Sequence, residues 1–254
     1  MAETQPDAAG SSTAPVRGAL IVLEGLDRSG KTTQVQILEK KLQEQGRKVE
    51  VLRFPDRTTP IGKMIDAYLK SEAAMDDHVI HLLFSANRWE AAAKIEALLH
   101  AGTTVVCDRY YYSGMVYSAA KGNALLPLSW ARGPEVGLPR PDLVVFLDLT
   151  EDQAKTRGGW GDEIYEKAEM QRRVRKLFWG LSFGKVGVGA EAFSEHPDHA
   201  PEHGYVTREE EEDLSVTDAS PTVDAVAESV WRVVESRIAA VDRGELGRTV
   251  RRVA

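Results

Sequence analysis

The chain has 254 residues, of which 43% are hydrophobic, and its formal net charge is −7. This length suits one α/β domain whose core needs no disulfide or metal, and the single cysteine, Cys107, cannot form an internal bridge. The acidic balance argues against a surface that binds duplex nucleic acid, and no apolar run approaches the roughly 20 residues that span a bilayer.

Residues 1–18 are rich in Ala, Ser, Thr, Pro and Gly, and this composition predicts a disordered tail. The segment has neither the hydrophobic stretch of a signal peptide nor the Arg-rich character of a transit peptide. We therefore expect a cytoplasmic protein, with access to the nucleus, whose folded domain spans residues 19–254.

Strands and helices are predicted to alternate along this domain. Short apolar or β-branched runs predict buried parallel strands, at residues 19–24, 49–53, 103–107, 143–147 and 214–217. Apolar residues at helical spacing predict helices, from the end of the first glycine-rich turn to Gly46 and at residues 61–69, 76–100, 151–157, 163–181 and 222–241. The alternation predicts a three-layer α/β fold with a doubly wound sheet of five parallel strands.

Residues 183–213 interrupt this order. They are rich in Gly, His, Pro and acids, and they end in an acidic run at 209–213. This composition predicts a solvated surface insertion, to which we assign no function.

The segment Gly25-Leu26-Asp27-Arg28-Ser29-Gly30-Lys31-Thr32 is a complete G-x-x-x-x-G-K-[ST] phosphate loop between a predicted strand and a predicted helix. Its glycines let successive amides point at one anion, and the helix adds the positive end of its dipole. Lys31 can reach the β and γ phosphates, and the Thr32 hydroxyl can coordinate Mg²⁺. The loop predicts an NTP-binding protein of the P-loop class.

Two residues inside the loop bear on the chemistry. Asp27 is a carboxylate beside a triphosphate site, where it needs another ligand or the metal as a partner. Arg28 is a cation beside the transferring group and fits an arginine finger supplied in cis. Taken alone, the two side chains favour a solvent-exposed pair, and the rest of the chain reverses this interpretation.

Asp108, Arg109 and Tyr110 follow a predicted strand, at the sheet edge where doubly wound folds bind their ligands. Asp108 suits a carboxylate that holds Mg²⁺, and Arg109 could clamp an acceptor phosphate together with Arg57. The alternative is that Asp108 and Arg109 pair with each other.

Phe84 and Arg88 lie four residues apart and share one face of the longest predicted helix. There a ring could stack on a base while the guanidinium bonds to the base edge. The pattern alone favours a core role for Phe84 and a surface ion pair for Arg88, and Phe54 carries the same ambiguity.

Several blocks, in this order, resemble thymidylate kinases. They are EGLDRSGKTTQ (24–34), LRFPDR (52–57), HLLFSANRWE (81–90), DRY (108–110) and GLPRPDL (137–143). The resemblance runs from residue 18 to 181 and resumes near Val216. It implies an enzyme that transfers the γ-phosphoryl group of ATP to dTMP, giving dTDP for dTTP synthesis, with Mg²⁺ as cofactor and usually as a homodimer.

Carried onto matching positions, the resemblance implies two groups of binding residues. Those near ATP are Gly25, Arg28, Ser29, Gly30, Lys31, Thr32, Thr33 and Arg157. Those near dTMP are Asp27, Phe54, Arg57, Phe84, Arg88, Arg109, Tyr110, Ser113, Gly114, Tyr117, Tyr165 and Gln171. The catalytic residues are Asp27, Arg28, Lys31 and Asp108, and the metal ligands are Thr32 and Asp108.

Residues 157–171 are similar to the lid of this family. Relatives often carry a basic residue just before the lid tyrosine, where this chain has Ile164. This departure puts more weight on Arg28, whose place in the phosphate loop is similar to the eukaryotic-type enzymes.

Two other functional classes remain open from the residues alone. One is a P-loop kinase for a deoxynucleoside or a different monophosphate, although Arg57 and Arg109 favour an acceptor that already carries phosphate. The other is a GTPase-like switch, although the chain has no Asn-Lys-x-Asp motif. A catalytically dead relative is disfavoured because the loop, Arg28 and Asp108 are intact.

Overall fold

The computed structural model describes residues 17–155, 157, 163–181 and 213–254. In this part of the chain five parallel strands form one sheet in the order β2-β3-β1-β4-β5. The strands are β1 (Leu20–Gly25), β2 (Val49–Arg53), β3 (Thr104–Asp108), β4 (Leu143–Asp148) and β5 (Leu214–Asp218). The sequence-based prediction of a five-stranded parallel α/β sheet is confirmed.

Helices connect the strands. The longer ones are α1 (Lys31–Glu44), α2 (Pro60–Leu69), α3 (Asp77–His100), α4 (Tyr111–Ala119), α7 (Ala168–Leu181) and α9 (Val223–Asp242). The shorter ones are α5 (Leu128–Arg132), the 3₁₀ turn η1 (Gly133–Glu135) and α6 (Glu151–Lys155). None of the described helices is both long and apolar enough to cross a membrane.

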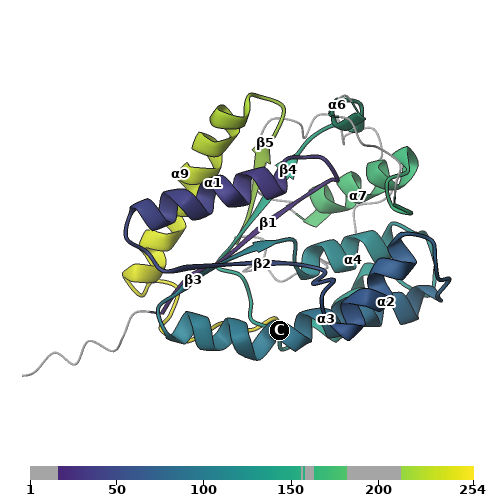
Figure 1. Cartoon of the computed structure of the whole chain (residues 1–254), viewed down its shortest axis with the longest axis horizontal. Coiled ribbons are helices and arrows are strands. Elements are labelled where there is room, and N and C mark those ends of the chain that lie inside the picture. The colour runs from purple at the N-terminus through teal and green to yellow at the C-terminus, as the bar shows by residue number, and fades with distance from the viewer. Residues whose placement is uncertain (1–16, 156, 158–162, 182–212) are drawn as a thin grey trace, which may run out of the picture.

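The two faces of the sheet are covered by different helices, as Figure 1 shows. Side chains alternate along β1, so Ile21 and Leu23 pack with α1 and α9, while Leu20 and Val22 pack with α3, α4 and α7. Strand β1 is therefore buried on both faces, which explains its continuous apolar run. Helix α2 packs on α3 through Ile65, alongside Ile80.

The order of the strands places the site. Because β1 and β3 are neighbouring parallel strands, the loop after Gly25 and the pair Asp108-Arg109 emerge at the same edge of the sheet. Arg53 ends β2 at this edge, and its guanidinium lies 3.9 Å from Asp108.

Predicted boundaries differ from the structure at several places. The helix predicted at 163–181 begins at Ala168, because residues 163–167 form a turn that faces the site instead. The helix predicted at 151–157 ends at Lys155. Residues 1–16 of the predicted tail lie outside the described residues, but Arg17 is buried and donates two 2.7 Å hydrogen bonds to the Asp142 carboxylate.

The acidic run requires a further correction. Residues 182–212 lie outside the described residues, so the predicted insertion is not tested there. Asp213, which the prediction placed in the solvated run, is buried against Arg140, Arg237 and Arg251. It directly precedes β5, and three guanidinium groups compensate its charge.

Candidate active site

A cavity of ≈ 840 Å³ opens at the carboxyl ends of β1, β2 and β3. It brings together nearly all the residues predicted for the site. Those that line it are Asp27, Arg28, Ser29, Gly30, Lys31, Thr32, Thr33, Phe54, Arg57, Phe84, Arg88, Asp108, Arg109, Tyr110, Ser113, Gly114, Tyr117, Arg157 and Tyr165. The two others, Gly25 and Gln171, bond to residues of the lining, as described below.

The phosphate loop has the backbone that its glycines predict. Gly25 and Gly30 have φ angles of 152° and 93°, and a Cβ at Gly25 would lie 2.7 Å from the Leu147 carbonyl oxygen. Arg28 also has a positive φ, of 67°, which is uncommon for a residue with a side chain. The loop is therefore held in a conformation that bends tightly around the first turn of α1.

Lys31 lies at the start of α1 with its ammonium inside the loop. It donates to the carbonyl oxygens of Gly25 at 3.2 Å and Leu26 at 2.6 Å. Burial, together with the nearby charge of Arg109, lowers the pKa of Lys31 to about 8. The loop thus holds a cation whose protonation responds to a nearby anion.

Thr32 and Asp108 form a small oxygen site beside Lys31. The Thr32 hydroxyl donates to the Asp108 carboxylate at 2.6 Å. Among the described residues there is no cluster of three or more His, Cys, Asp or Glu side chains that could hold a metal ion. One hydroxyl and one carboxylate fit Mg²⁺, which takes few protein ligands and shares the rest of its shell with phosphates and water.

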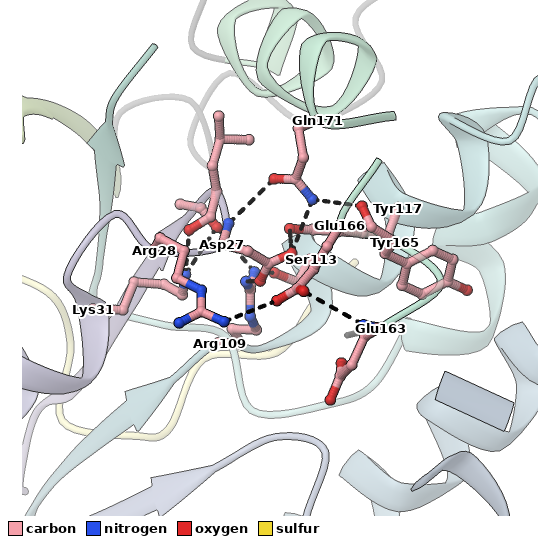
Figure 2. A network of polar contacts seen from close by, with 12 residues as sticks. Asp27, Arg28, Lys31, Arg109, Ser113, Tyr117, Glu163, Tyr165, Glu166 and Gln171 are labelled. Atoms are coloured by element: carbon pink, nitrogen blue, oxygen red, sulfur yellow. Dashed lines mark hydrogen bonds and ion pairs between the residues drawn. The ribbon is translucent and has the colours of Figure 1, made fainter. Parts of the chain in front are cut away.

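Asp27 is the centre of the polar network in Figure 2. Its carboxylate accepts hydrogen bonds from Arg109, from Gln171 Nε2 at 2.8 Å and from the Tyr117 hydroxyl at 3.2 Å. Burial alone would raise the pKa of Asp27, but the charges of Arg109 and Lys31 outweigh it and hold the pKa below its usual value. Asp27 is therefore a fixed anion at the middle of the cavity.

Arg109 pairs with Asp27 across the sheet edge. Its Nη1 also donates to the Gly25 carbonyl oxygen and to Ser113 Oγ, both at 2.9 Å. No hydrogen bond or ion pair joins it to Asp108 in the described structure. The alternative in which Asp108 and Arg109 pair with each other is thus wrong.

Two acids of the turn before α7 lie close to arginines of the cavity, and Figure 2 shows one of them, Glu166, beside Arg28. Glu163 accepts from Arg57 at 2.7 Å, and Glu166 lies 3.6 Å from the Arg28 guanidinium. Arg57 also donates to Asp66 at 2.6 Å. The segment predicted as a lid therefore contacts both sides of the cavity, although 158–162 lie outside the described residues.

Arg157 lies beside the phosphate loop. Its guanidinium donates to the carbonyl oxygens of Ala219 at 2.6 Å and Arg28 at 3.3 Å. This placement agrees with the expectation that it lies on the side of the phosphate loop. Tyr165 lies on the other side, with its ring 5.5 Å from that of Tyr117.

A mainly aromatic pocket forms the far end of the cavity. Phe84 is half-buried there, and Phe54 is buried against the Tyr110 ring, with centroids 5.5 Å apart. Arg88 is only 2% exposed and pairs with Glu135. The pattern-based interpretation of Arg88 as a surface ion pair is therefore wrong, because its partner is buried 47 residues further along the chain.

Sequence reasoning missed three groups of functional residues. Glu24 is fully buried and accepts from the backbone amides of Tyr110 and Ser113 at 2.9 and 3.0 Å, and burial raises its pKa. An acid that closes an otherwise apolar strand was a signal that could have identified it. Glu135 and the pair Glu163 and Glu166 gave no such local signal.

Comparisons with known proteins agree on one family. A family model described as thymidylate kinase matches residues 23–185. A thymidylate kinase of Schizosaccharomyces pombe is 56% identical over 165 residues, 65% of this chain and 77% of its own, and that of Homo sapiens is 48% identical over the same shares. The solved thymidylate kinase of Candida albicans has a TM-score of 0.75 at 33% identity, and the match covers 94% of this chain and 99% of the other.

Proposed function

This chain belongs to the thymidylate kinase family, and we propose that it transfers the γ-phosphoryl group of ATP to dTMP, giving dTDP. One observation carries the proposal. The phosphate loop and the aromatic pocket that contains Phe84 and Arg88 are two ends of the same cavity. A nucleoside monophosphate whose base occupies the pocket can therefore direct its phosphate at a triphosphate in the loop.

On the donor side, the loop amides and Lys31 bind the phosphates of ATP. Arg28 follows Asp27 in the loop, and its side chain is 34% exposed. A cation there can stabilise the negative charge that develops on the phosphoryl group during transfer. Arg157 lies on the same side of the cavity, where its guanidinium donates to the Arg28 carbonyl oxygen of the loop.

Thr32 and Asp108 are the residues that would hold Mg²⁺. When bound, the ion neutralises charge on the β and γ phosphate oxygens. The 2.6 Å contact between the two oxygen groups supports this assignment.

On the acceptor side, Arg57 and Arg109 bind the phosphate of dTMP, with bidentate hydrogen bonds as the expected geometry. Asp27 contacts the sugar end of the acceptor and keeps Arg109 oriented. Phe84 stacks on the thymine ring while Tyr110, buried beside Phe54, limits the space next to the sugar. Little covalent chemistry is needed, because alignment and charge neutralisation supply most of the rate.

A substrate panel tests this function. The purified chain is given ATP and Mg²⁺ with dTMP, dUMP, dCMP, dAMP, dGMP or thymidine, and kcat/KM is measured for each. We expect dTMP to be the best acceptor and thymidine to be inactive, because Arg57 and Arg109 need a phosphate to bind. Preference for another monophosphate, or phosphorylation of thymidine, would contradict the proposal.

We also propose that the protein is a homodimer. Helix α3 exposes Val79, Leu82 and Trp89 at helical spacing, each more than 40% exposed, and Met64 of the adjoining helix α2 is 49% exposed. Exposed apolar side chains gathered on neighbouring helices are typical of a protein interface.

The single cysteine, Cys107, is free and buried, which suits a reducing compartment. We propose the cytoplasm, with access to the nucleus, as the location of the protein.

A further inference from the structure

Behind the aromatic pocket lies a buried ion pair. Arg88 on α3 donates from Nε to Glu135 Oε2 at 2.9 Å, and from Nη2 to Glu135 Oε1. Arg88 is 2% exposed and Glu135 is fully buried. Two parallel hydrogen bonds fix both the position and the plane of the guanidinium.

The other side of the guanidinium is closed by α4. A Cβ built at Gly114 would lie 2.5 Å from Arg88 Nη2 and 2.9 Å from its Nη1. The guanidinium therefore lies against the helix backbone, where a side chain would displace it. No hydrogen bond from Arg88 Nη1 occurs among the described residues, so this group is the donor that Arg88 can offer to the cavity that it lines.

His81 lies behind Glu135 and is also fully buried. Its Nε2 is 4.0 Å from Glu135 Oε1, and its Nδ1 lies 2.8 Å from Ser118 Oγ. Burial lowers the pKa of His81 to about 4, so the imidazole is neutral at pH 7. The charge of Glu135 is thus left to balance Arg88.

We propose that Glu135 is a positioning residue that fixes Arg88, so that its Nη1 group donates to a carbonyl oxygen on the edge of the base. This inference rests on the proposed function, since it concerns how dTMP is recognised. A guanidinium has donors and no acceptor. Thymine presents a carbonyl oxygen at its 4-position, where cytosine presents an amino group, which is also a donor.

The fixed position is what gives the selectivity. A mobile arginine could turn away from an amino group and tolerate dCMP. An arginine held by Glu135 and Gly114 keeps its donor in place. When dCMP binds, the cytosine amino group therefore faces the Arg88 donor in a buried pocket, and neither donor has an acceptor. Leaving buried donors unpaired is costly, and the pocket therefore rejects cytosine.

The test is Glu135→Gln, which keeps the shape of the side chain but removes its charge and one acceptor. We expect KM for dTMP to rise about tenfold or more, and the ratio of kcat/KM for dTMP over dCMP to fall by a similar factor. KM for ATP should change less than about twofold, since the donor side is untouched. Arg88→Ala should lower the ratio as well, and the double variant should be no less selective than Arg88→Ala, because Glu135 acts through Arg88.

Asp142→Asn is the matched control. It breaks another buried pair with two hydrogen bonds, between Arg17 and Asp142, which does not line the cavity. We expect it to lower the melting temperature without changing the dTMP to dCMP ratio. Should Glu135→Gln fail to fold, Glu135→Asp keeps the charge on a shorter side chain and should still raise KM for dTMP but not for ATP.

Two results would overturn the inference. One is an unchanged dTMP to dCMP ratio in a folded Glu135 variant. The other is a parallel rise of KM for dTMP and ATP, which is the pattern of general structural damage. Failure of the unaltered protein to phosphorylate dTMP would instead refute the proposed function.

Discussion

Arg28 and Arg109 lie in the same cavity, but the fold holds them differently. Arg109 is bonded to Asp27, Ser113 and the Gly25 carbonyl oxygen, so its guanidinium is fixed. Arg28 has a looser contact, 3.6 Å from Glu166, and is more exposed. The fixed cation suits the binding of an acceptor phosphate, and the freer one suits charge that appears during transfer.

We predict that Arg28→Ala lowers kcat by at least about 10²-fold, since a cis arginine is worth about 10³-fold or more in related phosphoryl transfer. The dissociation constant for dTMP should change less than about threefold, because Arg57 and Arg109 remain. Steady-state kinetics and calorimetry measure the two effects. Lys40→Ala, an exposed cation on α1 that pairs with Glu44, is the control, and near-normal turnover of the Arg28 variant would show that another group supplies the charge.

The titration of Lys31 gives a second prediction at this scale. With its pKa lowered to about 8, the free protein carries an ammonium below that pH and a neutral amine above it. ATP favours the ammonium, so its dissociation constant should rise as pH increases from 7 to 9, by up to about tenfold per pH unit above 8. Adenosine, which has no phosphates, should bind without this dependence.

A constant affinity for ATP across the same pH range would contradict the prediction. It would mean that Lys31 stays charged or does not contact the phosphates.

At the scale of elements, the sequence carries much of the architecture because its signals are local. Apolar runs identified the five strands, and the glycine-rich loop located the start of α1. Long-range pairings have no such signal: composition placed Asp213 in a solvated run, whereas three arginines bury it. Likewise, the helical period of Phe84 and Arg88 identified a shared face but could not show that Glu135 lies behind it.

Helix α7 contributes to the site through Gln171. The side chain accepts a hydrogen bond from the Asp27 amide at 3.2 Å and donates to the Asp27 carboxylate at 2.8 Å. It also donates to the Tyr165 carbonyl oxygen at 2.8 Å, which ties α7 to the turn before it. Through Gln171, the helix thus fixes the position of the phosphate loop relative to the turn.

We predict that Gln171→Ala raises KM for dTMP about tenfold, because Asp27 loses a buried donor and then holds Arg109 less firmly. KM for ATP should change less, since Lys31 and the loop amides are intact. Glu169→Ala, which removes an exposed partner of Arg173 on the same helix, controls for helix stability. Equal effects of the two substitutions on KM would show that Gln171 is not specific to the site.

At the scale of the whole molecule, the sheet separates two hydrophobic layers, and the last residues of the chain lie beside α3 (Figure 1), where Arg252 donates to Glu96 at 2.6 Å. The Val253 carbonyl oxygen accepts from the Gly137 amide at 2.8 Å, and the Val253 amide donates to Leu138 at 3.0 Å. These bonds attach the last residues to the segment that follows Glu135. The apolar residues exposed on α2 and α3 lie outside this packing and are the expected dimer surface.

We predict that the protein sediments as a dimer of its 28.0 kDa chain and that Leu82→Lys shifts it to the monomer. A charge in the middle of an apolar interface is costly to bury, whereas on a free surface it is tolerated. Val223→Lys on α9, where Val223 is 52% exposed, is the matched control and should leave the mass unchanged. A monomeric unaltered protein, or a dimer that persists in Leu82→Lys, would contradict the assigned surface.

The central claim is that one cavity directs the γ-phosphoryl group of ATP to dTMP. ATP labelled in its γ-phosphate tests this most directly, with the label followed in the presence and absence of dTMP. We predict that the label appears in dTDP when dTMP is present and that little is released as inorganic phosphate without it, because water is excluded from the aligned site. Release of the label as inorganic phosphate at the same rate with and without dTMP would contradict the claim and indicate a nucleotide hydrolase.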